Sequence, residues 1–94
     1  MNKKRSRLEV IRDILKVISE RADRTGGVKP THILYKSNLS YQMMDEYLNE
    51  LKTKEFVVEK ITKEGKRYTI TEKGLKFLQE YQTVAGFMDS FGLG

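Results

Sequence analysis

The sequence predicts a mainly helical α+β fold, in which three helices are followed by a two-stranded β-hairpin and an additional C-terminal helix. Three observations support this prediction. Residues 33–54 read as two helices joined by a tight turn, residues 56–71 alternate as a β-hairpin does, and capping residues precede helical stretches. A chain of 94 residues is long enough for one small domain with a single core.

The first helix is expected to begin near residue 7, because Ser6-Arg7-Leu8-Glu9 has the form of a capping box. An apolar stripe at helical spacing follows, made of Leu8, Ile11, Leu15, Ile18 and Ala22 and widened by Val10, Ile14 and Val17. This stripe is wider than the core of one small domain usually requires. It therefore leaves Val10 and Val17 as candidates for contact with a second chain.

Residues 33–54 carry the signals of a helix-turn-helix. Asn38 can adopt the left-handed conformation that ends a helix, Leu39 can fill the gap between two helices, and Ser40 can cap the next one. One face of the longer helix is apolar, with Met44, Tyr47, Leu48 and Leu51, and the opposite face is polar, with Gln42, Asp45, Glu46, Asn49 and Thr53. On these residues alone, a plain helical hairpin is an equal interpretation.

The β-hairpin pattern favours the helix-turn-helix. Residues 56–61 are rich in β-branched and aromatic side chains, Gly65 stands where a turn needs positive φ, and residues 66–71 alternate. A hairpin directly after a helix-turn-helix makes a winged helix-turn-helix, whose wing here has a basic tip of Lys63, Lys66 and Arg67. Upstream, residues 23–27 are expected to form a loop, residues 28–29 one short strand, and Pro30 the start of the second helix.

A final helix should follow Thr71, which can cap it. One side of this helix, marked by Leu75, Leu78 and Ala85, is expected to pack on the domain. A second set has heptad spacing and predicts a dimer interface: Phe77, Tyr81, Val84, Met88 and Phe91. The alternative is that both sets belong to the core, but a domain this small has little interior left. We thus expect a flexible basic arm over residues 1–6, a winged domain over 7–71 and a dimerisation helix over 72–91.

Composition excludes several classes of protein. There is no cysteine and His32 is the only histidine, so we expect no disulfide, no metal site and no cofactor. No Ser-His-Asp set, paired-carboxylate cleft or glycine-rich nucleotide loop is evident, so we expect no enzyme. No apolar run approaches the ~20 residues of a membrane span, and no signal-peptide core is present, which favours a cytoplasmic protein.

The net charge of +5 is unevenly distributed. Residues 1–22 carry seven basic and three acidic side chains, and residues 56–71 carry four basic and two acidic ones. The helix region 40–55 is acidic instead, with two basic and four acidic side chains. A basic balance is typical of a nucleic-acid partner, but the acidic helix opposes non-specific binding to DNA.

The residues Leu34-Tyr35-Lys36-Ser37-Asn38-Leu39-Ser40-Tyr41, the Gly65-Lys66 wing and Thr71-Glu72-Lys73-Gly74 resemble a family of small archaeal winged-helix proteins. The resemblance covers roughly residues 6–82, and its most distinctive part is the Asn-Leu-Ser-Tyr turn. That family includes abundant chromatin-associated DNA-binding proteins and predicted transcriptional regulators. The resemblance implies a nucleoid-associated homodimer, joined through a C-terminal helix that forms an antiparallel coiled coil.

Binding to duplex DNA would divide the candidate residues into two groups. Phosphate contacts are expected from the arm and other basic side chains, namely Lys3, Lys4, Arg5, Arg7, Lys29 and Lys36, and from the wing residues Lys63, Lys66 and Arg67. The longer helix of the helix-turn-helix would be the recognition helix, and contacts along it are expected from Ser40, Tyr41, Gln42, Asp45, Asn49 and Lys52. The arm has the alternative interpretation of a solvated tail.

A second class of function stays open at this point. Winged helices also serve as docking modules, and here Tyr41, Met43 and the acidic helix face could meet a basic protein partner. The two functions differ in their response to salt, because binding to DNA weakens steeply as salt is added.

Overall fold

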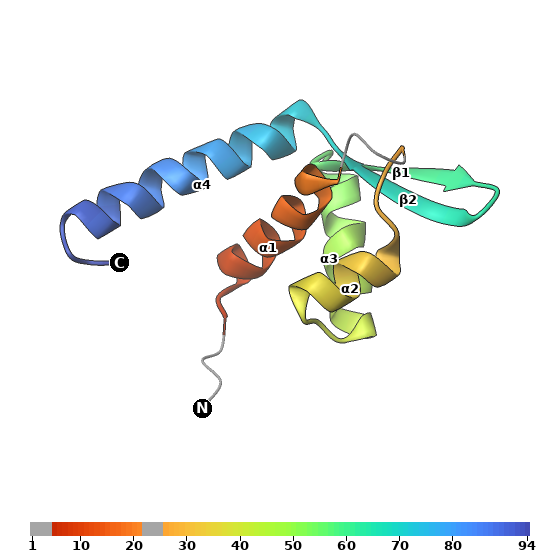
Figure 1. Ribbon diagram of the computed structural model, residues 1–94, viewed down its shortest axis with the longest axis horizontal. Helices are drawn as coiled ribbons and strands as arrows, with labels where there is room; N and C mark the ends of the chain where they lie inside the picture. Colours follow the sequence, from red (N-terminus) through yellow and green to blue (C-terminus); the bar gives the residue numbers. More distant parts are fainter. Residues whose placement is uncertain (1–4, 22–25) are drawn as a thin grey trace.

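The chain folds in the order that the sequence predicts. The computed structural model describes residues 5–21 and 26–94. Within them lie α1 (Arg7–Glu20), α2 (Pro30–Ser37), α3 (Tyr41–Thr53), β1 (Val57–Thr62), β2 (Gly65–Ile70) and α4 (Glu72–Ser90). Helices α1, α2 and α3 gather into a body from which the β-hairpin and α4 project in opposite directions (Figure 1). The α+β, mainly α fold with a hairpin wing and an additional helix is confirmed.

Helix α1 begins at its predicted capping box. The Ser6 hydroxyl oxygen accepts a hydrogen bond from the Glu9 N–H at 3.1 Å, and the Ser6 N–H donates to the Glu9 carboxylate at 3.0 Å. The prediction that Val10 and Val17 could meet a second chain is wrong, since they are only 3% and 9% exposed in the core of their own chain. Ala22 lies outside the described residues, and among the stripe residues that the structure describes, Leu8 is the one left exposed. The reason is that α2, β2 and α4 all pack on α1 and cover the side that carries the valines.

The helix-turn-helix is closed by the residues that predicted it. Asn38 ends α2 with φ 53°, in the left-handed region, and Leu39 is half-buried against the core. The Ser40 hydroxyl accepts from the Met43 N–H at 3.2 Å and so caps α3. The inward face of α3 is buried at Met44, Leu48 and Leu51, with Tyr47 half-buried beside them.

The wing is a two-stranded antiparallel hairpin whose register runs from Val57↔Ile70 to Thr62↔Gly65. Its loop is Lys63-Glu64, and Gly65 has φ 109°, as the turn requires. Val28 forms an isolated β-bridge beside the hairpin: its N–H donates to the Tyr68 carbonyl at 2.8 Å, and its carbonyl accepts from the Tyr68 N–H at 2.9 Å. A short strand was expected at residues 28–29; the structure has this single bridge at Val28, which attaches the start of α2 to the wing.

Helix α4 leaves the hairpin through a close contact with the domain. The Thr71 hydroxyl caps α4 by accepting from the Gly74 N–H at 3.1 Å. Phe77 and Leu78 pack against the core, whereas Leu75, which was expected to pack there, is exposed. Leu75 lies about 100° around the helix from the buried Gly74, at the edge of the covered side, so the expectation for Leu75 is wrong. In the described part of the chain, none of the helices is long and apolar enough to span a bilayer.

Candidate nucleic-acid interface

The outer face of α3 presents an uninterrupted row of polar groups to solvent. Gln42, Asp45 and Asn49 are all exposed, as the sequence predicted, and Tyr41 is exposed at the start of the helix. The Gln42 side-chain N–H lies 3.4 Å from the Glu46 carboxylate one turn later, a weak contact that a stronger acceptor can replace. Ser40 differs, because its hydroxyl is used as the helix cap.

The negative charge of α3 is partly neutralised within the fold. Glu50 forms ion pairs with Arg7 and with Lys54, the second at 3.0 Å. The pKa of Glu50 is lowered, first by its hydrogen bond with Lys54 and then by that with Arg7. The acidic groups that face solvent on the outer side of α3 are therefore Asp45 and Glu46. The repulsion of a phosphate backbone is smaller than the formal charge of residues 40–55 suggests.

Lys52 joins the end of α3 to the base of the wing. Its ammonium group lies 3.3 Å from the Glu59 carboxylate on β1, and Lys66 approaches the same carboxylate at 3.9 Å. Glu59 and Lys66 share one side of the hairpin with Tyr68, which packs into the core, because side chains alternate along each strand. Lys66 therefore leaves the wing on the side where α3 lies, and Lys63 is exposed in the loop.

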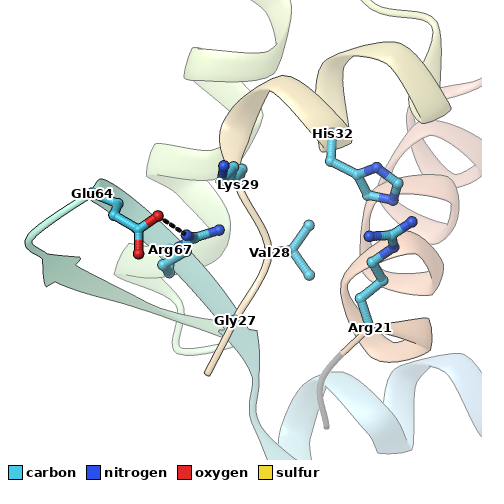
Figure 2. Close-up of a pocket in the computed structure, with 7 residues that line it drawn as sticks. All are labelled: Arg21, Gly27, Val28, Lys29, His32, Glu64 and Arg67. Atoms are coloured by element: carbon cyan, nitrogen blue, oxygen red, sulfur yellow. Dashed lines mark ion pairs between the residues drawn. The ribbon is translucent and has the colours of Figure 1, made fainter. Parts of the chain in front are cut away.

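Arg67 does not lie exposed at the wing tip, which corrects the prediction for this residue. It is only 8% exposed, and its guanidinium lies 3.8 Å from the Glu64 carboxylate (Figure 2). The segment around Gly27 covers it so closely that a Cβ atom at Gly27 would lie 2.9 Å from the Arg67 Cβ. Lys60 pairs with Arg67 across the hairpin and is exposed on this same side, so it faces away from α3.

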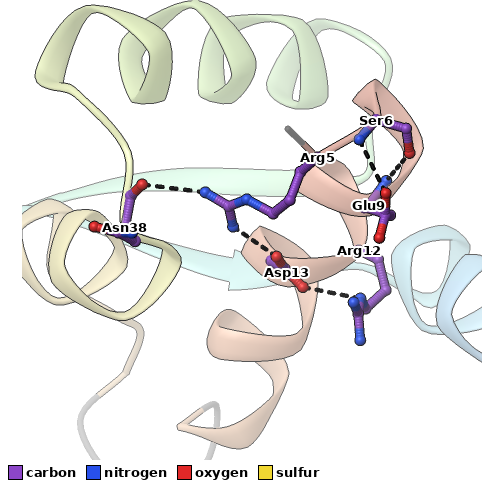
Figure 3. A network of polar contacts seen from close by, with 6 residues as sticks. All are labelled: Arg5, Ser6, Glu9, Arg12, Asp13 and Asn38. Atoms are coloured by element: carbon purple, nitrogen blue, oxygen red, sulfur yellow. Dashed lines mark hydrogen bonds and ion pairs between the residues drawn. The ribbon is translucent and has the colours of Figure 1, made fainter. Parts of the chain in front are cut away.

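The described part of the arm is tied to the helix-turn-helix. The Arg5 guanidinium lies 2.7 Å from the Asp13 carboxylate and donates to the Asn38 carbonyl at 3.1 Å (Figure 3). Arg7 pairs with Glu50, and its guanidinium carbon lies 5.7 Å from the centroid of the Tyr47 ring. Both cations therefore already have partners within the fold. Lys3 and Lys4 lie outside the described residues.

Lys29 and Lys36 stand at the two ends of α2. Lys29 is the residue before the helix and Lys36 lies in its last turn, and both are exposed. Lys29 thus lies next to the β-bridge that joins Val28 to the wing, whereas Lys36 lies near the turn that leads to α3.

The predicted dimer residues divide into two groups along α4. Phe77 is half-buried in edge contact with Phe56, at 5.9 Å between ring centroids, and Arg12 lies 5.2 Å from the centroid of the half-buried Tyr81 ring. Further along, Val84, Met88 and Phe91 are exposed, between 41% and 66%. Phe87, which the heptad spacing did not include, is exposed as well, and its ring centroid lies 5.1 Å from that of Phe91.

A family model described as winged helix-turn-helix matches residues 4–88, nearly the whole chain. The chain belongs to this family. Among solved structures, the DNA-binding protein Sso10a-2 from Sulfolobus solfataricus is similar, with a TM-score of 0.75 and 22% identity over 93% of this chain and 85% of that one. None of the curated proteins compared with the chain matches it.

Structures of MepR from S. aureus are similar at lower identity. One MepR variant has a TM-score of 0.74 and 14% identity, over 87% of this chain and 61% of the other. MepR bound to ethidium bromide has a TM-score of 0.68 and 13% identity, over 87% and 59% of the two chains. The chain therefore spans about three fifths of the MepR structures. At these identities the likeness concerns the fold.

Across residues 5–21 and 26–94, no group of three or more His, Asp and Glu side chains gathers closely enough to hold a metal ion. The groups that the interface presents are amides, carboxylates and ammonium groups. These groups recognise a partner by hydrogen bonds and charge.

Proposed function

We propose that this protein binds duplex DNA and acts as a dimeric transcriptional regulator or chromatin-associated protein of the cytoplasm and nucleoid. The observation that carries the proposal is the exposed polar face of α3 next to the basic side of the wing. Membership of the winged helix-turn-helix family supports it, as does the likeness to a protein described as DNA-binding. The role is one of binding, without catalysis.

The two parts of the interface would have different tasks. An α-helix fits the major groove of B-DNA, where the amides of Gln42 and Asn49 can pair with adenine edges and Asp45 can accept from cytosine N4. Lys63 and Lys66 would bind phosphates, since both leave the wing at its loop or on the side of α3. Because Asp45 and Glu46 repel phosphates, α3 should add selectivity while the wing adds most of the affinity.

Salt titrations test the contribution of the wing. Fluorescence anisotropy with random duplex DNA should give a log Kd that rises linearly with log salt. Lys63→Ala/Lys66→Ala should flatten this slope by about 0.9 for each phosphate that the variant no longer neutralises. Lys76→Ala is the matched control, because Lys76 is exposed on α4. An unchanged slope in the double variant would exclude the wing from the interface.

Substitutions on α3 test base recognition. Gln42→Ala and Asn49→Ala should each cost ~1–3 kcal/mol at a preferred site and little on random DNA. Asp45→Ala should tighten binding to random DNA, because it removes a charge that repels phosphates. If Asp45→Ala weakened binding to random DNA instead, α3 would not lie in the groove.

The exposed residues of α4 carry the dimer part of the proposal. Val84, Phe87, Met88 and Phe91 form an apolar surface on a helix that has left the domain, and soluble proteins usually cover such surfaces. Pairing two copies of α4 about a two-fold axis would cover both surfaces. It would also hold two α3 helices apart at a fixed distance, which favours paired half-sites about one helical turn apart.

Light scattering during gel filtration tests this pairing. The unmodified protein should be a dimer at micromolar concentration, and Val84→Glu/Met88→Glu should make it a monomer, because both side chains are exposed in the single chain. Leu75→Glu is the control, because Leu75 is about as exposed as Met88 but lies elsewhere around the helix. A monomeric unmodified protein, or a double variant that still dimerises, would refute the pairing through α4.

Three exposed side chains near the turn favour a second candidate function, docking to another protein. Tyr35 and Tyr41 are 80% and 70% exposed, and Met43 lies beside them in sequence at 42%. Exposed aromatic and methionine side chains are enriched where proteins bind each other. Docking through them should depend little on salt, so the same titrations separate the two functions.

A further inference from the structure

A basic pocket lies away from the α3 face, where the end of α1, the start of α2 and the wing meet. It has a volume of about 630 Å³ and is lined by Arg21, Gly27, Val28, Lys29, His32, Glu64 and Arg67. Val28 lies between two pairs of groups, Lys29 with Arg67 on one side and Arg21 with His32 on the other (Figure 2). Pockets of this size hold small molecules.

The charge of this pocket is strongly unbalanced. The lining contains three basic side chains, Arg21, Lys29 and Arg67, and one carboxylate, that of Glu64. That carboxylate is a weak partner, since it lies 3.8 Å from the Arg67 guanidinium and its side chain is 75% exposed. Burying the Arg67 charge with so little compensation is unfavourable unless an anion completes the site.

The position of Arg67 is fixed by the fold. The chain crosses it at Gly27 and is held there by the two hydrogen bonds between Val28 and Tyr68. By strand alternation Arg67 leaves the hairpin on the side opposite Lys66, and so on the side opposite the proposed DNA face. A planar guanidinium held in this way is suited to bind two oxygens of a phosphate group at once.

The first turn of α2 adds to the positive potential. Lys29 precedes the helix and provides no side-chain acceptor for it, so the partial positive charge of the helix start borders the pocket. His32 lies in the same turn, and its pKa is lowered, first by desolvation and then by Arg21 and Lys36, while Glu20 acts in the opposite direction. At neutral pH the imidazole is therefore uncharged and can donate one N–H.

We propose that this pocket binds the phosphate group of a small phosphorylated molecule, with Arg67 and Lys29 as its main ligands and Arg21 and His32 at its far end. The site does not depend on the α3 face and stands whether or not the protein binds DNA. A ligand with two phosphoryl groups can reach both pairs of side chains, so inorganic pyrophosphate should bind more tightly than inorganic phosphate.

NMR of His32 tests the proposal directly, because the chain has one histidine and so one imidazole signal pair. Pyrophosphate added at constant ionic strength should shift that signal saturably and raise the pKa of His32. Arg67→Gln and Lys29→Gln should each weaken binding about tenfold, the effect of losing one charge-assisted hydrogen bond. Lys76→Gln, on exposed α4, should leave binding unchanged.

Two outcomes would overturn the site: a shift that chloride reproduces at the same ionic strength, or unaltered pyrophosphate binding by Lys29→Gln. Circular dichroism checks the folding of Arg67→Gln, and Lys29→Gln keeps the test decisive if that variant unfolds, because Lys29 is exposed.

Competition with duplex DNA identifies the source of the phosphate. If DNA and pyrophosphate bind together, the pocket serves a free small molecule; if they compete in the unmodified protein and not in Lys29→Gln, it receives a backbone phosphate. Pyrophosphate binding without DNA binding would remove the proposed function and keep the pocket. DNA binding without pyrophosphate binding would remove the pocket and keep the proposed function.

Discussion

Helices α1 and α4 have similar apolar patterns and opposite surroundings. Every apolar residue in the middle of α1, from Val10 to Ile18, is buried or half-buried in its own chain. In α4 the only buried residue is Gly74, and Val84, Phe87, Met88 and Phe91 remain exposed. Helix α1 contacts α2, β2 and α4, whereas α4 contacts α1 and β2 and projects away from the helical body (Figure 1).

The contrast between α1 and α4 defines what helical periodicity can indicate. An apolar stripe shows that a helix face is meant to be covered, but it does not say whether the same chain covers it. For α1 the cover comes from its own domain, and for α4 we propose a second copy. Matched substitutions in α1 and α4 test this distinction.

The largest difference is expected between Ile14→Ala on α1 and Val84→Ala on α4. Ile14 is 0% exposed and Val84 is 61% exposed. Ile14→Ala should lower the free energy of unfolding by ~2–5 kcal/mol, because it leaves a cavity in the core. Val84→Ala should change it by less than ~0.5 kcal/mol in the monomer. Urea denaturation at several protein concentrations measures both, and a large, concentration-independent effect of Val84→Ala would place Val84 in the core.

The second prediction concerns the point where α4 leaves the domain. A Cβ atom at Gly74 would lie 2.5 Å from the Phe56 carbonyl oxygen and 2.6 Å from Ile70 Cγ1, so Gly74→Ala should cost ~1–3 kcal/mol through a forced shift of the helix. Gly86→Ala is the matched control, because a Cβ there would have no neighbour within 4 Å. It should stabilise the helix by ~0.5–1 kcal/mol. Equal effects at both glycines in thermal unfolding would contradict the close docking of Gly74.

Local signals predicted much of this fold. The caps at Ser6, Ser40 and Thr71 and the left-handed Asn38 depend on residues at most four positions away, so the sequence is sufficient to place them. The orientation of α1 was not predictable in this way. Its apolar stripe is wide, so the sequence does not show which part of the stripe is buried. Val10 and Val17 are buried and Leu8 is exposed because of the positions of helices and strands distant in sequence.

The interface shows the same limit. The outer face of α3 was predicted because helical periodicity alone separates Gln42 and Asn49 from Leu48. Arg67 was misplaced because the segment that buries it, around Gly27, lies forty residues earlier in the chain. Arg5 and Arg7 were predicted to be available for phosphate contacts for a similar reason. Their ion-pair partners, Asp13 and Glu50, come close to them only in the folded chain.

A smaller effect should follow from the contact between the two helices. The Arg12 guanidinium carbon lies 5.2 Å from the Tyr81 ring centroid, and its Nε lies 2.9 Å from the Asp13 carboxylate. Arg12→Ala should cost ~0.5–1 kcal/mol and should speed hydrogen exchange in α4 from about residue 78 onward. Lys16→Ala is the control, because the Lys16 side chain is exposed one turn later on α1. Unchanged exchange in α4 would mean that Arg12 does not help to hold it.

The smallest effect is a dependence of stability on pH, and it should separate the domain body from α4. The pKa of His32 is held below its ordinary value of 6.5 by desolvation and by the charges of Arg21 and Lys36. As the pH falls, the unfolded chain therefore takes up this proton before the folded chain does, and the free energy of unfolding should decrease from about pH 6.5 downward until the folded chain is protonated too. His32→Gln should remove this part of the slope in urea titrations, and an unchanged slope would assign it to other groups. The dissociation constant of the dimer should not change over the same pH range, because the exposed residues proposed to pair on α4 are apolar.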